Sequence, residues 1–83
     1  MALNIEWSDE ARADIRRLDK PSARRIFDAA LRFARTGQGD IKQLQGEYAG
    51  KLRLRAGEYR LFLSPTAGTL RIHSVRHRKE AYR

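Results

Sequence analysis

The spacing of the hydrophobic residues changes at one short stretch, residues 36–40 (TGQGD), whose two glycines indicate a loop. Before it, apolar residues recur every three or four positions, which is the period of an amphipathic helix. After it, they alternate with polar residues, which is the period of a strand with one buried face. We therefore expect a helical half followed by a strand half within a single α+β domain spanning residues 1–83.

The helical half predicts a short strand and two helices. Alternation over residues 2–7 indicates the strand. Ser8 is suited to cap a first helix that ends near residues 19–20, and Pro21 fits the first turn of a second helix. Gly37 ends the second helix. The apolar stripe of that helix consists of Ala23, Ile26, Phe27, Ala30, Leu31, Phe33 and Ala34.

The strand half predicts three consecutive strands, at residues 51–55, 58–64 and 69–75, joined by short turns. Strands linked in this way form an antiparallel meander. Strict alternation in the last strand places Ile72 on one face and Val75 on the other. We expect the helices to cover one face of the twisted sheet.

A tight turn at residues 56–57 would set Leu54 opposite Tyr59, and Arg53 opposite Arg60. The helices would then cover the face that carries Leu52, Leu54 and Leu61. The opposite face would carry Lys51, Arg53, Arg55 and Arg60. Like charges directly across a strand pair are unfavourable, so this face indicates either an anionic ligand or arginines that spread over a solvated surface.

The charge of the chain is strongly positive and unevenly distributed. The formal net charge is +8, with 8 basic and 7 acidic residues in residues 1–41 but 10 basic and 3 acidic in residues 42–83. This asymmetry favours a polyanionic partner such as a nucleic acid. With no cysteine, the chain has no disulfide, cysteine–zinc site or thiol nucleophile, and we expect no cofactor or metal. The absence of a long apolar run or signal-peptide pattern predicts a cytoplasmic protein that does not enter the membrane.

Three side chains of the strand half have both a structural and a functional interpretation. His73 is expected to be packed or solvated within a strand, whereas His77, between arginines, could carry a proton. Tyr82 follows a run of basic residues and has no obvious core to join. It is either a frayed terminal aromatic, a platform for base stacking, or a group for proton transfer.

Four segments carry a family resemblance: residues 5–11 (IEWSDEA), 44–46 (LQG), 51–61 (KLRLRAGEYRL) and 75–82 (VRHRKEAY). In this order and spacing the chain resembles the RelE branch of the RelE/ParE toxin superfamily of bacterial and archaeal type II toxin–antitoxin systems. The resemblance spans essentially the whole chain. It implies the RelE-like fold, with two helices on a twisted antiparallel sheet, and an acidic antitoxin protein as partner.

The resemblance also implies an endoribonuclease that enters the ribosomal A site and cuts messenger RNA there without a metal ion. Carried over by position, the catalytic residues are Lys51, Arg53, Arg60, Arg78 and Tyr82. Arg76 or His77 could take the place of Arg78. The expected RNA-binding residues are Arg55, Arg71, Arg76, His77 and Lys79.

Such a site would promote attack of the RNA 2′-hydroxyl on the adjacent phosphate. Clustered cations neutralise the developing charge, and they also lower the pKa of a neighbouring lysine or tyrosine, so that Lys51 or Tyr82 could act as the general base. Two other functions remain open. One is a ParE-like toxin that inhibits DNA gyrase, and the other is a non-catalytic RNA-binding protein.

Overall fold

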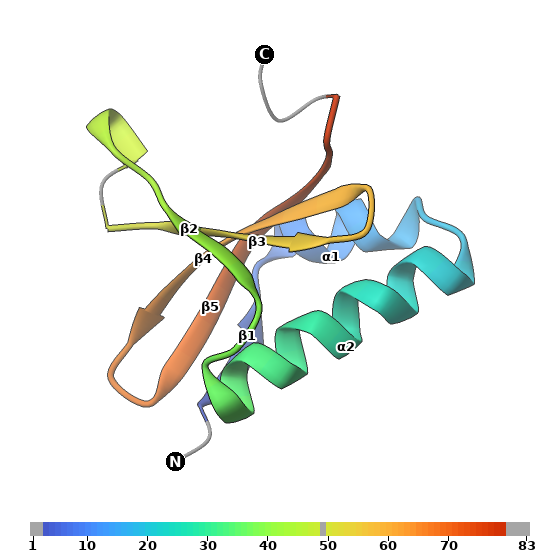
Figure 1. Cartoon of the computed structure of the whole chain (residues 1–83). Helices are drawn as coiled ribbons and strands as arrows, with labels where there is room; N and C mark the ends of the chain where they lie inside the picture. The colour runs from blue at the N-terminus through green and yellow to red at the C-terminus, as the bar shows by residue number, and fades with distance from the viewer. Residues whose placement is uncertain (1–2, 49, 80–83) are drawn as a thin grey trace.

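A computed structural model describes residues 3–48 and 50–79, apart from the side chain of Tyr48. Five strands form one sheet in the order β1-β5-β4-β3-β2, in which β1 and β5 are parallel and the other neighbours are antiparallel. Two helices lie on one side of this twisted sheet (Figure 1). The elements are β1 (Asn4–Trp7), α1 (Asp9–Arg16), α2 (Lys20–Thr36), β2 (Asp40–Gln43), a 3₁₀ turn (Gly46–Tyr48), β3 (Leu52–Ala56), β4 (Tyr59–Thr66) and β5 (Thr69–His77).

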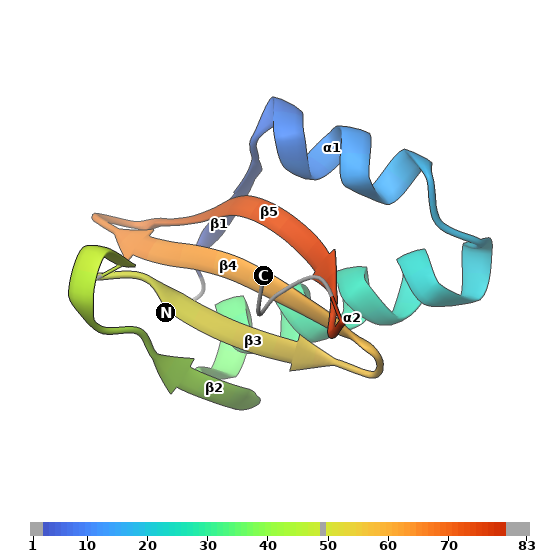
Figure 2. The ribbon, with the colours of Figure 1, turned by 90° about the horizontal axis from the view of Figure 1, so that it is seen from above.

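The predicted α+β architecture is confirmed, and one strand is added to it. β2 was not predicted, because its four residues contain a single half-buried apolar side chain, Ile41, and so show no alternation. It pairs with β3, with Ile41 opposite Leu54. Seen from above, β2 extends the sheet beyond β3 on the side away from β1 (Figure 2).

Helix α1 is joined to the sheet by its cap. The Oγ atom of Ser8 accepts a hydrogen bond from the Ala11 amide (3.0 Å) and donates one to the His73 carbonyl of β5 (2.6 Å). The helix ends at Arg16, earlier than predicted, because Asp19 caps the next helix by accepting from the Ser22 amide (3.2 Å). That hydrogen bond lowers the pKa of Asp19.

Helix α2 follows its predicted stripe and contacts β3 and β1. Ile26, Ala30 and Ala34 are fully or nearly fully buried in the core. Phe27 and Leu31, which widen the stripe, remain 45% and 49% exposed. Phe27 meets Trp7 edge-on, with ring centroids 5.0 Å apart.

The predicted register of the β3–β4 hairpin is wrong by two residues. Gly57 and Glu58 form the turn, so that Arg55 faces Arg60 and Arg53 faces Phe62. Gly57 has a positive φ of 62° and stands at the first central position, where type II′ hairpin turns favour glycine. A shift of two residues leaves every side chain on its predicted face.

The predicted orientation of Val75 is also wrong, because β5 is irregular. The pairing with β4 shifts between Phe62 and Leu63, and one extra residue of β5 is accommodated there. Such a bulge reverses the alternation of the strand. Val75 is therefore buried in the core, together with Leu70 and Ile72.

Candidate nucleic-acid interface

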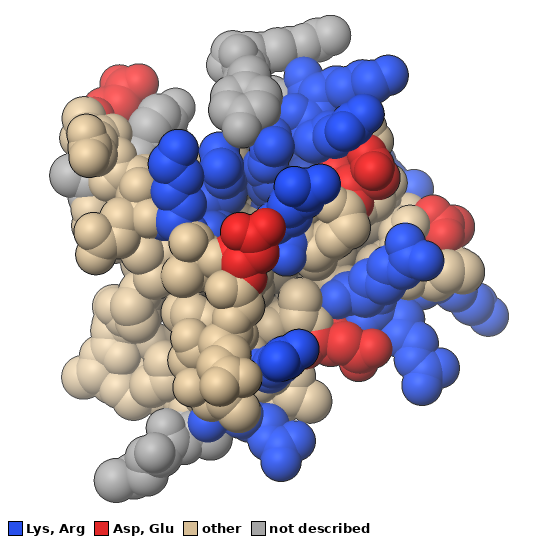
Figure 3. Space-filling model, in the orientation of Figure 1, with Lys and Arg blue, Asp and Glu red and all other residues tan. Residues whose placement is uncertain are grey.

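Because side chains alternate along each strand, many lysines and arginines lie on the sheet face that points away from the core. We call this the basic face, and its cations are Lys42, Arg53, Arg55, Arg60, Arg71 and Arg76 of the strands, with Lys51 directly before β3. Figure 3 shows lysines and arginines gathered over the upper part of the molecule, with an uncharged area below them. The interior-facing residues of the same strands, such as Leu54, Leu61 and Leu63, are almost completely buried.

The register arranges the basic face in rows. One row runs Lys42–Arg53–Phe62–Ser74 across β2, β3, β4 and β5, and the next runs Asp40–Arg55–Arg60–Arg76. Arg60 thus has an arginine opposite it on each neighbouring strand. Adjacent like charges raise the free energy of the folded protein, and an anion placed over Arg55 and Arg60 would lower that cost.

The structure brings the predicted site residues Arg60 and Arg78 together. The Arg60 Nη1 donates to the Arg78 carbonyl (3.2 Å), and the Arg78 amide donates to the Glu58 carbonyl (2.8 Å). The Arg78 guanidinium also pairs with the Glu58 carboxylate, with 2.9 Å between Nε and Oε2. These contacts fix the chain after β5 beside the start of β4. Tyr82, the fifth predicted catalytic residue, lies outside the described residues.

Arg71 and Arg76, which we predicted to bind RNA, form ion pairs with residues of the first half. Arg71 pairs with Glu6 of β1, and Arg76 pairs with Glu10 and Asp14 of α1. Their charges are therefore compensated within the fold.

Asp14 is the one charged side chain that the structure buries among the described residues, at 4% exposure. Its Oδ2 accepts from the Val75 amide (2.9 Å) and from Arg76, and its Oδ1 accepts from Arg17 (2.6 Å). Our sequence reasoning missed this residue. The available signal was its spacing, since Asp14 follows Ala11 by three positions on the buried side of the helix.

His73 lies beside Lys51 and Arg71 at the other end of the basic face. Burial lowers the pKa of His73, and the neighbouring positive charges of Lys51 and Arg71 lower it further. Its Nε2 is 2.7 Å from the Ser64 Oγ on β4, within hydrogen-bonding distance. His73 is thus held neutral near pH 7, and Ser64 orients its ring.

His77 does not join the basic face. Its ring stands perpendicular to that of Tyr59, with centroids 5.3 Å apart, and its Nδ1 accepts from the Lys79 amide (3.2 Å). Both rings line an open hollow of about 450 Å³ on the α1 side of the sheet, together with Asp14 and Arg17. Lys79 is exposed just beyond β5.

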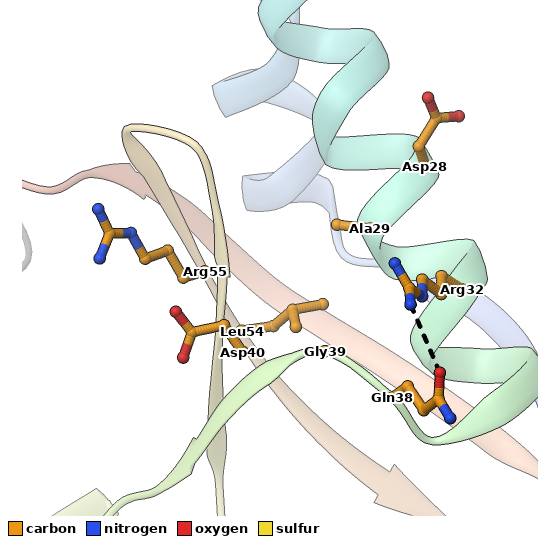
Figure 4. Close-up of a pocket in the computed structure, with 8 residues that line it drawn as sticks. All are labelled: Asp28, Ala29, Arg32, Gln38, Gly39, Asp40, Leu54 and Arg55. Atoms are coloured by element: carbon orange, nitrogen blue, oxygen red, sulfur yellow. Dashed lines mark hydrogen bonds between the residues drawn. The ribbon is translucent and has the colours of Figure 1, made fainter.

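A second hollow, of about 270 Å³, lies between α2 and the β2–β3 pair (Figure 4). Arg32 donates to the Gln38 side chain there (3.4 Å), while Asp28 and Asp40 contribute negative charge. Charges of both signs make this hollow a poor site for an anion. Among residues 3–48 and 50–79, no three His, Asp or Glu side chains are grouped as metal ligands would be.

The basic face and its surroundings suit binding of a phosphodiester chain. Arginine and lysine bind phosphate oxygens, and a row of them can neutralise charge that develops during phosphate chemistry. No helix in the described part of the chain is both long and apolar enough to span a membrane.

Solved structures of the same fold come from toxin–antitoxin systems. The RelBE2 toxin–antitoxin complex from Mycobacterium tuberculosis contains a chain with 25% identity and a TM-score of 0.85, and the match covers 96% of this chain and 95% of that one. The RelE–RelB complex from Pyrococcus horikoshii OT3 matches at 19% identity and a TM-score of 0.79, covering 96% and 99%. YafQ from E. coli, as its H87Q mutant, matches at 14% identity and a TM-score of 0.74, covering 98% and 99%.

No curated protein matches the chain in sequence. A family model does match it over residues 5–82, and that model describes the ParE toxin of the type II toxin–antitoxin system parDE. This match spans nearly the whole chain, and the fold of RelE, YoeB and YafQ toxins agrees with it. The chain therefore belongs to the ParE toxin family, within the RelE/ParE superfamily of type II toxin–antitoxin toxins.

Proposed function

We propose that this toxin is a ribosome-dependent endoribonuclease that cuts messenger RNA at the A-site codon. The observation that carries the proposal is the basic face. On it, Arg53 lies on β3 and Arg60 on the adjacent strand β4, and Arg60 donates a hydrogen bond to the Arg78 carbonyl. Lys51 stands at the edge of the same face, close enough to His73 to influence its charge. The similarity to a chain of the RelBE2 toxin–antitoxin complex supports a role as the toxin of such a pair.

The chemistry needs no group beyond the RNA and these side chains. The 2′-oxygen of one nucleotide attacks the adjacent phosphorus, a P–O bond forms, and the bond to the 5′-oxygen of the next nucleotide breaks. Arg53 and Arg60 would bind the phosphate oxygens, and Arg78 would stabilise the negative charge on the leaving oxygen. Lys51 and Tyr82 would take the proton from the 2′-hydroxyl and return one to the leaving oxygen.

The partner of such a toxin would be a cognate antitoxin in the cytoplasm. Several solved relatives are complexes of a toxin with its antitoxin, among them the RelBE2 and RelE–RelB pairs. An acidic antitoxin segment that folds on binding would fit the positive charge of the basic face.

The test is cleavage of a messenger RNA positioned on purified ribosomes with an empty A site, in a buffer whose only divalent ion is the Mg²⁺ that ribosomes require. Wild type is compared with Arg60→Ala, Arg78→Ala and Tyr82→Ala, and free messenger RNA serves as a substrate control. Arg24→Ala is the matched control variant, because Arg24 is an exposed arginine of α2 away from the basic face. We expect a single cut in the A-site codon that leaves a 2′,3′-cyclic phosphate. Each site variant should lower the rate by roughly 100-fold or more, as loss of a transition-state cation does.

A second candidate follows from the family model itself, whose description is that of a ParE toxin. ParE-like inhibition of DNA gyrase would leave ribosome-bound messenger RNA intact and stop the supercoiling of relaxed plasmid. Both assays therefore use the same preparation. Inhibition of gyrase without any cut on ribosomes would refute the nuclease proposal and remove the catalytic roles of all five residues.

A further inference from the structure

Phe62 is an aromatic residue in an unusual position. It lies on β4, the central strand of the sheet, and its neighbours in sequence, Leu61 and Leu63, are completely buried in the core. Alternation turns Phe62 to the opposite face. It is half-buried, and it belongs neither to the buried core nor to the partly buried side chains packed against that core. Core packing therefore gives no reason for an aromatic ring here.

The surroundings of Phe62 are polar and cationic. Arg53 is opposite on β3, Ser74 is opposite on β5, and Arg60 and Ser64 flank it along β4. Among the strand residues that the structure describes on this face, Phe62 is the only one with an apolar side chain. The other members of the face are Asn4, Glu6, Asp40, Lys42, Arg53, Arg55, Arg60, Ser64, Thr66, Thr69, Arg71, His73, Ser74 and Arg76.

A flat apolar ring surrounded by cations is the arrangement that binds single-stranded nucleic acid. The ring offers a surface on which a base can stack, and the cations contact the phosphates on either side. Directly opposite residues in a sheet, such as Arg53 and Phe62, are about 5 Å apart. Residues two positions apart on one strand, such as Arg60 and Phe62, are about 7 Å apart. Both arginines can therefore reach the phosphates of a base lying over Phe62.

We propose that Phe62 is a stacking platform for one base of single-stranded RNA on the basic face. This inference rests on the proposed function and adds to it a residue that positions the substrate. Stacking accepts any base, so Phe62 contributes affinity and orientation without selecting a sequence.

The test measures binding of a fluorescently labelled single-stranded RNA to the full-length protein over a range of salt concentrations. Phe62→Leu retains apolar volume but removes the ring, and Phe62→Trp retains a ring. Phe27→Leu is the matched control, because Phe27 is an exposed aromatic residue of α2 outside the basic face. Circular dichroism and thermal unfolding verify that each variant is folded.

We expect Phe62→Leu to raise the Kd about tenfold, within the range for loss of one base–aromatic stack, while Phe62→Trp and Phe27→Leu bind like wild type. The salt dependence of binding should be the same for wild type and Phe62→Leu, because the phosphate contacts remain. An RNA that carries abasic sites supplies the decisive control. Wild type and Phe62→Leu should bind this RNA equally, since it has no base to stack.

Two kinds of result would refute the proposal that Phe62 stacks on a base. The first is the absence of any difference on intact RNA, because wild type and Phe62→Leu bind equally or wild type does not bind. The second is a loss of affinity in Phe62→Leu that persists on abasic RNA. That result would mean that the ring supports the structure of the basic face and does not stack on a base. Ribosomal cleavage by wild type is measured separately. If Phe62 does not stack but the messenger RNA is still cut, the nuclease proposal remains valid; if the messenger RNA is not cut, the nuclease proposal is refuted.

Discussion

The buried carboxylate of Asp14 should be one of the main single-residue contributions to the stability of this domain. It is 4% exposed and accepts hydrogen bonds from the Val75 amide and from the side chains of Arg76 and Arg17. Asp14→Ala would leave the Val75 N–H without its acceptor, which costs about 1–3 kcal/mol for a buried donor. It would also separate Arg76 from its buried partner.

The magnitude can be bounded from these contacts. Breaking a fully buried pair costs about 3–5 kcal/mol, but the Arg76 side chain is 33% exposed and keeps Glu10, so the lower end applies. We expect Asp14→Ala to lose about 3 kcal/mol of unfolding free energy. A small domain loses roughly 4–8 °C in Tm per kcal/mol, so the Tm should fall by more than about 10 °C.

The assay is urea and thermal unfolding of wild type, Asp14→Ala, Asp14→Asn and Asp28→Ala. Asp14→Asn keeps an acceptor for the Val75 amide and should lose less than the alanine variant. Asp28 is an exposed carboxylate of α2, and its loss should change stability by less than about 0.5 kcal/mol. A loss below about 1 kcal/mol in Asp14→Ala would refute the reasoning, because it would mean that water or another side chain replaces the acceptor.

Three further predictions concern stability and pH. Ser8→Ala should lose at least about 1 kcal/mol in urea unfolding, because Ser8 both caps α1 and donates to the His73 carbonyl; an unchanged midpoint would contradict this. Gly39→Ala should lose about 1–3 kcal/mol of unfolding free energy, since the new Cβ would lie 2.8 Å from the Cδ1 of buried Leu54. Gly68→Ala is the control: its Cβ would meet no atom within 4 Å, so this variant measures the cost of a positive φ alone. Because the pKa of His73 is lowered in the folded protein, the unfolded chain binds this proton at a higher pH than the folded chain does. The free energy of unfolding should therefore fall as the pH drops below the ordinary value of 6.5. His73→Gln should flatten this part of the pH profile, and a profile identical to wild type would exclude His73 as its source.

Much of the fold follows from local patterns that the sequence states directly. Capping by Ser8, the buried stripe of Ile26, Ala30 and Ala34, and the alternation of β3 each depend on one element and its neighbours in sequence. The faces of the hairpin were predicted correctly even with the wrong turn, because a slip of two residues preserves the side on which each residue lies.

Other features depend on contacts distant in sequence, and local patterns do not report them. The bulge opposite Phe62 and Leu63 turns the Val75 side chain to the opposite face of the sheet, and no residue near Val75 in the sequence indicates that bulge. Strand β2 forms because β3 offers an open edge, although its own residues are mostly polar. The ion pairs that hold Arg71 and Arg76 join residues more than 60 positions apart, so the sequence alone could not distinguish these two arginines from the other arginines of the strand half.

Those long-range pairs change how the charge asymmetry of the chain should be interpreted. Counted by sequence, the second half carries nearly all the excess positive charge. In the fold, the carboxylates of Glu6, Glu10 and Asp14 lie against β5 and compensate Arg71 and Arg76. These three carboxylates thus offset positive charge on β5, whereas Arg53, in the row of Phe62, and Arg60, in the next row, lie on β3 and β4. It follows that neutralising Arg76 should chiefly lower stability, whereas neutralising Arg53 should chiefly weaken RNA binding and reduce its salt dependence by about one phosphate contact. The reverse pattern, measured by urea unfolding and salt-dependent RNA binding of Arg76→Gln and Arg53→Gln, would show that the anion binds over β5.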